Sequence, residues 1–146
     1  MKLHQNLALG IISCLENILK EKKALRFSLN QLLKQNRKWG SRDRRLVGDS
    51  ILEIIRWKRL FTDIGKLNTK SDKYYWNLLG IWMLKKQIPF QDLECFSEIK
   101  TESIDFEFNR KSKTRAILQS IPDWLDDLGL KNCGKTVWEK EIEKLN

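Results

Sequence analysis

The alternation of apolar and polar residues along the chain predicts helices rather than strands. Apolar residues recur at spacings of three and four over residues 3–23, which is the pattern of a helix with one buried stripe. The same spacing predicts a short helix over residues 30–35 with Asn30 as its N-cap. It also predicts a long helix over residues 41–64, which Ser41 would cap and Gly65 would end.

The second half of the chain continues this pattern. A helix is predicted over residues 71–87, stopped before Pro89, and a shorter one over residues 90–99. A last pair is predicted in SIPDWLDDLGL, with Pro122 in the first turn, and in KTVWEKEIEKLN. Residues 92–107 hold six acidic residues and one lysine, which is typical of a solvated loop. The chain is therefore predicted to be all-α, with about six to seven helices in one domain over residues 1–146.

Composition narrows the class of protein. A hydrophobic content of 41% is enough for a packed core, and no segment is long and apolar enough to span a bilayer. Glu16 interrupts the first apolar run and no small-residue cleavage site follows it, so no secretory signal is predicted. The three cysteines are far apart and form no CxxC pair, which favours reduced thiols in the cytoplasm over disulfides or a zinc site.

Positive charge is the main functional signal. The net charge is +9, as expected of a protein that binds nucleic acid or another anionic surface. On a helical projection of residues 41–64, Arg42 and Arg45 share an arc with Arg56 and Arg59, separate from the apolar arc.

Two interpretations of this arginine stripe are open. Arg45 with Asp49, and Glu53 with Arg56, have the spacing of local ion pairs on a helix. However, residues 20–45 hold ten basic and only two acidic residues, more charge than local pairs neutralise. The excess predicts contacts with RNA phosphates. The residues predicted to make them are Arg37, Lys38, Arg42, Arg44, Arg45, Arg56 and Arg59.

Aromatic residues add less to the functional prediction. Five tryptophans fall within helical apolar patterns, which predicts core packing rather than base stacking. These five are Trp57, Trp76, Trp82, Trp124 and Trp138. Trp39, beside Lys38 and before Gly40, has a context in which stacking on a base is equally plausible.

No catalytic or metal-binding motif is found in the sequence. The one histidine, His4, lies at the N-terminus without a patterned partner, and no phosphate-binding glycine motif occurs. Asp123, Asp126 and Asp127 fall early in a predicted helix, where carboxylates complement the helix dipole. No cofactor is therefore predicted for this chain.

Three segments, in order, resemble one protein family. GSRDRRLVGDSILEIIRW, IPFQDLECFSEIK and SIPDWLDDLGLKNCGKTVWEKEIEKLN are similar to segments of the NusB-like N-terminal domain of the Fmu/Sun (RsmB-like) ribosomal RNA cytosine-5 methyltransferases. The resemblance covers nearly the whole chain from about residue 5. It implies a NusB-like helical bundle that docks ribosomal RNA to a methyltransferase core.

In that family the catalytic core follows this domain and binds S-adenosylmethionine. Cys14, Cys95 and Cys133 match neither cysteine motif of the core, so no catalytic residue is carried over. The resemblance thus implies a non-catalytic part of a longer enzyme, with ribosomal RNA and a C-terminal methyltransferase domain as its partners. The alternative is a free-standing NusB-like module for protein interaction or transcription antitermination.

Overall fold

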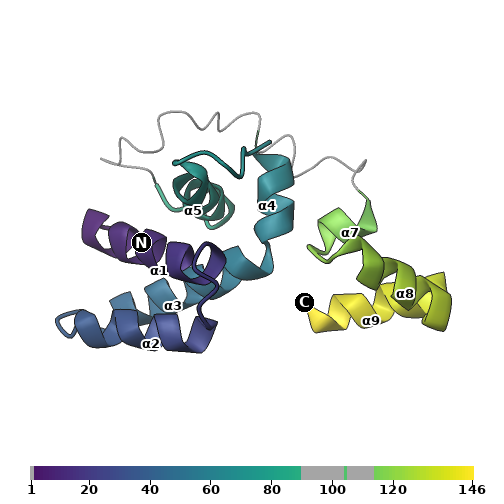
Figure 1. The fold of residues 1–146 in the computed structure, drawn as a ribbon, viewed down its shortest axis with the longest axis horizontal. Helices are drawn as coiled ribbons and strands as arrows, with labels where there is room; N and C mark the ends of the chain where they lie inside the picture. Colours follow the sequence, from purple (N-terminus) through teal and green to yellow (C-terminus); the bar gives the residue numbers. More distant parts are fainter. Residues whose placement is uncertain (1, 90–103, 105–113) are drawn as a thin grey trace.

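A computed structural model of the chain describes residues 2–89, 104 and 114–146 (Figure 1). These residues form helices and no strand, which confirms the prediction of an all-α bundle. The described helices are α1 (Gln5–Leu19), α2 (Leu25–Gln35), α3 (Ser41–Arg56), α4 (Lys58–Ile64), α5 (Tyr74–Lys85), α7 (Arg115–Leu118), α8 (Asp123–Cys133) and α9 (Lys135–Leu145).

Helix α1 is the centre of the N-terminal unit. It contacts α2, α3 and α5, and in Figure 1 it lies between α5 and the pair formed by α2 and α3. Ile11 and Leu15 of α1 are fully buried together with Ile51 and Ile54 of α3 and other aliphatic side chains. The apolar stripes predicted for both helices therefore meet in one core, whose burial stabilises this unit.

The N-cap residues of two helices differ from the prediction. Helix α2 begins at Leu25 with Ala24 in the N-cap position, so Asn30 lies in the middle of the helix and the prediction that it caps was wrong. The leucines from Leu25 onward pack on the core, which extends the helix towards its N-terminus. Helix α3 begins at Ser41 as predicted, but Gly40 occupies the N-cap position and contributes no side-chain cap.

The helix predicted over residues 41–64 is two helices. Trp57 leaves the helical conformation, with φ −101° and ψ 14°, and separates α3 from α4. Helix α4 then contacts α5 on one side and α7 on the other. Because α4 turns away from the axis of α3 (Figure 1), it packs against both α5 and α7. Gly65 follows α4, as predicted.

The predictions for the middle of the chain are tested only in part. Helix α5 covers most of the predicted residues 71–87 and ends before Pro89. The helix predicted over residues 90–99 lies outside the described residues. The acidic segment 92–107 also lies outside them, except for Ile104, which is buried in the N-terminal core.

The C-terminal unit has a small core of its own. Ala116 of α7, Ile121, and Trp138 and Ile142 of α9 form a second buried cluster. The short helix α7 was not predicted, and α8 begins at Asp123, directly after Pro122 rather than with Pro122 in its first turn. Helices α4 and α7 are in contact, so the two units touch. Since each unit has its own buried cluster, the single domain over residues 1–146 stays a prediction.

The tryptophans divide differently from the prediction. Trp82 and Trp138 are buried as predicted, and Trp57 and Trp76 are partly buried against the N-terminal core. Trp124 was predicted to lie in the core, but 66% of it is exposed because it lies on the outer side of α8. Trp39, the candidate for base stacking, is only 9% exposed. Its ring packs against α1 beside Gly10, where an added Cβ would lie 2.7 Å from the ring, so Trp39 is not available for stacking.

We expect Cys14 to resist alkylation near neutral pH while Cys133 reacts. Cys14 is buried, and burial raises its pKa to about 11, so almost none of it is the reactive thiolate. Cys133 is exposed. Iodoacetamide labelling followed by peptide mass spectrometry checks this. Equal labelling of the two cysteines in the folded protein would contradict the packing of α1 described here.

Candidate nucleic-acid interface

Residues 22–42 contain no aspartate or glutamate, and we call this segment the basic stretch. It includes the residues before α2, α2 itself, the α2–α3 turn and the start of α3. Its lysines and arginines are all exposed, and none forms a salt bridge with a carboxylate in the part of the chain that the structure describes. They are Lys22, Lys23, Arg26, Lys34, Arg37, Lys38 and Arg42.

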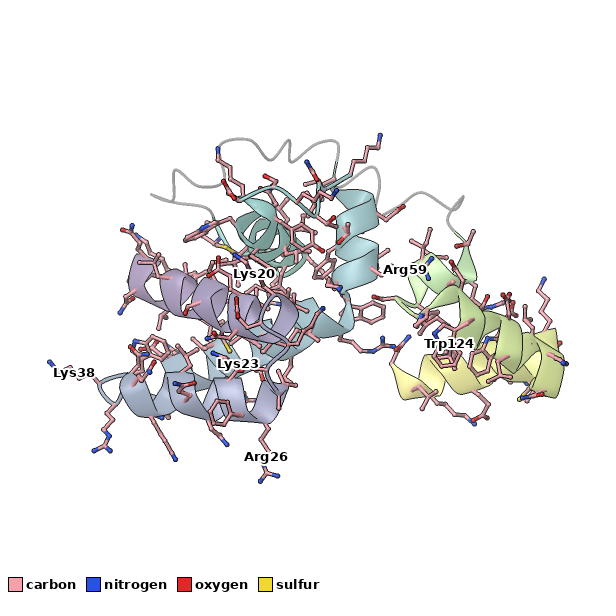
Figure 2. The ribbon with its side chains drawn as sticks, in the orientation of Figure 1. Lys20, Lys23, Arg26, Lys38, Arg59 and Trp124 are labelled. Carbon is pink, nitrogen blue, oxygen red and sulfur yellow. The ribbon has the colours of Figure 1, made fainter. Side chains whose placement is uncertain are left out.

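Helix α2 separates this charge from the core. Its leucines pack on the N-terminal core, so the opposite side of the helix carries the polar residues into solvent. In Figure 2, Arg26 and Lys38 extend away from the bundle at either end of α2, while Lys23 lies beside α1 and α2. The charge is therefore distributed along the whole helix.

Two hollows lie along the basic stretch. The first, about 630 Å³, is at the C-terminal end of α2, where Lys34, Arg37 and Lys38 line it with Asn36 and other residues. The second, about 470 Å³, is at the start of α3 and includes Arg42 and Arg45 in its lining. A helix start also favours anions, because its first N–H groups lack partners within the helix. Asp43 borders the first hollow and Asp49 the second, so each contains one carboxylate.

Arg44 and Arg45 have different environments. Arg44 donates from Nε to the carbonyl oxygen of Trp39 at 3.0 Å and from Nη2 to that of Asn36 at 3.5 Å, which ties α3 to the end of α2. Arg45 lies 3.7 Å from Asp49, as predicted, but 85% of its side chain is exposed. Such an exposed pair contributes little to stability. Arg45 therefore remains accessible, whereas Arg44 holds the turn.

Arg56 and Arg59 lie away from the basic stretch, against the C-terminal unit. Arg59 donates to the carbonyl oxygen of Ile121 and lies 2.7 Å from Asp123, and Figure 2 shows it facing α7 and α8. Arg56 donates to the carbonyl oxygen of Ser120 at 3.5 Å, and its guanidinium lies 5.1 Å from the centre of the Trp57 ring. The predicted arginines thus form two groups rather than one stripe.

The predicted pair of Glu53 with Arg56 was wrong. Glu53 instead binds Lys86 at 2.8 Å and accepts a hydrogen bond from the Trp82 indole at 3.0 Å. Burial of Glu53 opposes ionisation, but the hydrogen bonds from Lys86 and Trp82 outweigh it and lower the pKa of the carboxyl. Because α5 packs on α3, Trp82 of α5 and Lys86 directly after it reach Glu53, and Arg56 turns towards the C-terminal unit.

Four of the seven basic residues were missing from the residues predicted from the sequence: Lys22, Lys23, Arg26 and Lys34. The absence of acidic residues over this segment was the signal that could have found them.

Elsewhere in the described residues, no cluster of three His, Cys, Asp or Glu side chains could hold a metal ion. No helix among those described is long and apolar enough to cross a membrane.

Comparison of the chain with models of known protein families finds no match. Comparisons with curated proteins and with solved structures find no significant similarity either.

Proposed function

We propose that this chain is a non-catalytic RNA-binding domain whose basic stretch contacts phosphates. The observation that carries this proposal is the set of seven exposed cations in residues 22–42, which contain no acidic residue. Phosphate contacts by lysine and arginine supply most of the affinity of non-specific nucleic-acid binding. RNA is preferred over DNA here because of the family resemblance of the sequence.

The contacts of the predicted residues support different roles for them. Arg37, Lys38 and Arg42 are free cations beside the two hollows, and we propose that they bind phosphates directly. Arg45 borders the second hollow and would join them when its exposed pair with Asp49 opens. Arg44 positions the turn that carries Arg37 and Lys38.

The three sequence segments that resemble the NusB-like domain support a more specific proposal for the RNA and the enzyme. A NusB-like domain of the Fmu/Sun type would dock ribosomal RNA to a cytosine-5 methyltransferase core that binds S-adenosylmethionine. In this arrangement the described residues supply binding and orientation, and the core supplies the chemistry. Reading the natural gene beyond the codon for Asn146 tests this part, because the proposal requires a methyltransferase domain with its two motif cysteines to follow.

A triple substitution tests phosphate binding. The variant R37Q/K38Q/R42Q is expected to bind a short unstructured RNA roughly tenfold more weakly than the unaltered protein. The slope of log affinity against log salt should fall by about 2, since each phosphate contact contributes about 0.7 for single strands. Fluorescence anisotropy titrations over a range of salt concentrations measure both quantities.

The matched control is K131Q/K135Q/K140Q, which removes the same charge from exposed positions on α8 and α9. It should leave the salt slope unchanged. Equal effects of the two triple variants on RNA affinity would show that binding depends only on the net charge of the protein, and the proposed interface would be wrong.

Arg59 is expected to act on stability rather than on RNA binding. The variant R59Q should keep RNA affinity within twofold and lower the free energy of unfolding by roughly 1 kcal/mol, because the pair with Asp123 is partly exposed. Thermal unfolding and anisotropy measure the two effects. A loss of RNA affinity as large as that of the triple variant would place Arg59 in the interface instead.

A protein-interaction module is the second candidate, and one observation favours it. Trp124 and Leu128, one helical turn apart on α8, are both exposed, and exposed tryptophan is typical of protein contacts. If the unaltered protein binds RNA no more strongly than R37Q/K38Q/R42Q does, at every salt concentration, the result would favour this function over RNA binding.

A further inference from the structure

A polar cavity of about 220 Å³ lies between α1 and α2. At about 30 Å³ for each molecule of liquid water, it has room for roughly seven waters. Cys14 and Leu32 border it, but most of its lining is polar. The polar residues are Ser13, Asn17, Lys23, Ser28, Gln31 and Gln35.

Ser28 is the unusual member of this lining. It is only 2% exposed, and its hydroxyl has no hydrogen-bond partner among the described residues. A buried polar group without a partner lowers stability, so native proteins usually satisfy such a group with protein, water or ligand. The hydroxyl can donate and accept, and the amides of Gln31 and Gln35 line the same cavity.

The surroundings of the cavity suit a nucleotide. Lys23 lines it and donates to Asn17 Oδ1 at 3.2 Å, leaving further N–H groups of its ammonium for a phosphate. Gln31 and Gln35 also border a neighbouring hollow of about 400 Å³ beside Phe27, a ring that is 60% exposed. Lys34 lines that hollow as well. An aromatic ring, amides and cations are thus arranged side by side along α2.

We propose that the cavity between α1 and α2 binds one unpaired base of the RNA. This inference rests on the proposed RNA-binding function and specifies its substrate as a strand with free bases. A base is flat and carries donors and acceptors on its edge, which amide and hydroxyl side chains read by hydrogen bonds. Its phosphates would lie on Lys23 and Lys34, and an adjacent base would stack on Phe27. The volume is smaller than that of sites for drug-sized ligands, about 300–1,000 Å³, and fits a single ring system better.

The test compares an unstructured RNA of ten nucleotides with its abasic counterpart, which has the same phosphates and no bases. The unaltered protein is expected to bind the complete RNA about tenfold more tightly in anisotropy titrations at fixed salt. S28A and Q31A should each reduce this difference several-fold and leave abasic binding unchanged. Q5A is the control for Q31A, because Gln5 is also an exposed glutamine and does not border the cavity.

S28A removes an unsatisfied hydroxyl, so its melting temperature should be unchanged or higher, which separates a binding effect from unfolding. Equal affinity of the unaltered protein for the two oligonucleotides would overturn the base site and leave phosphate binding standing. Preference for bases that S28A and Q31A do not alter would also overturn it, because the bases would then bind elsewhere. Binding of neither oligonucleotide would overturn the proposed function and the base site together.

Discussion

Replacement of Asp126 by alanine should destabilise the C-terminal unit by about 3 kcal/mol. The Asp126 carboxylate binds Arg115 through two hydrogen bonds, from Nε at 2.8 Å and from Nη2 at 3.1 Å. It also accepts a hydrogen bond from the Trp138 indole at 2.7 Å. Alanine would leave the guanidinium and the indole N–H without this partner. Removing one member of a buried pair costs about 3–5 kcal/mol, and the lower end applies because Arg115 retains some exposure and its contact with Glu139.

Urea unfolding followed by tryptophan fluorescence measures this loss. The control is D127A, since Asp127 is the neighbouring residue of α8 but is exposed. Substitutions at such exposed positions usually change stability by less than about 0.5 kcal/mol. If D126A and D127A unfold at the same urea concentration, the buried network does not stabilise this unit.

The effect of D126A should depend on pH. Hydrogen bonds from Arg115 outweigh the effect of burial and, with that from Trp138, lower the pKa of Asp126 in the folded protein. A group whose pKa is lowered on folding stabilises the protein above its unfolded pKa, about 3.9 for aspartate, and this contribution is lost as pH falls through the folded value. The difference in the free energy of unfolding between the unaltered protein and D126A should therefore be largest near neutral pH and become smaller in acid. A difference that stays constant down to acid pH would contradict this linkage.

Gly129 to alanine is expected to destabilise the same unit by about 2–3 kcal/mol. A Cβ at Gly129 would lie 2.2 Å from two atoms of the Trp138 ring, far inside van der Waals contact. The ring cannot move away freely, because its indole N–H is bonded to Asp126. Either the ring shifts and loses that bond, or α8 and α9 separate and expose the small core.

A second glycine provides the matched control. Gly48 lies within α3, and a Cβ there would meet no atom within 4 Å. G48A should raise stability by about 0.5–1 kcal/mol, because alanine favours the helix and restricts the unfolded chain. Urea unfolding of the two variants should give changes of opposite sign. A stabilising G129A would show that the α8–α9 contact is looser than described.

The sequence predicted those helices whose apolar stripe meets one large core, and it failed where contacts distant in the chain decide the conformation. The spacing of Ile51, Ile54 and Phe61 continues across Trp57, so the periodicity alone gave no sign of the break between α3 and α4. Trp124 and Trp138 occupy similar positions in apolar patterns. Only the pairing of α8 with α9 decides that one is exposed and the other buried.

For the candidate site, charge and exposure could be predicted from the sequence, whereas the contacts of the arginines could not. The excess of positive charge was visible in the sequence, and Arg37, Lys38 and Arg42 are exposed as a phosphate-binding role requires. The partners of Arg56 and Arg59 are more than sixty residues away in the chain, so helical projection could not separate them from the other arginines. Ser28 gave no signal either, because a serine in a helix is ordinary until the surrounding side chains are placed.

The bonds of Arg44 to the α2–α3 turn have a consequence for the entropy of binding. Its guanidinium is bonded to the carbonyl oxygens of Asn36 and Trp39, on either side of Arg37 and Lys38, and the Trp39 ring is buried against α1. The backbone that carries these two cations is therefore ordered before any ligand arrives. Immobilising a flexible segment on binding reduces affinity, and a preorganised segment avoids most of that cost. The turn thus holds the backbone of Arg37 and Lys38 in place, so that under the proposed function only their side chains would have to be ordered when phosphates bind.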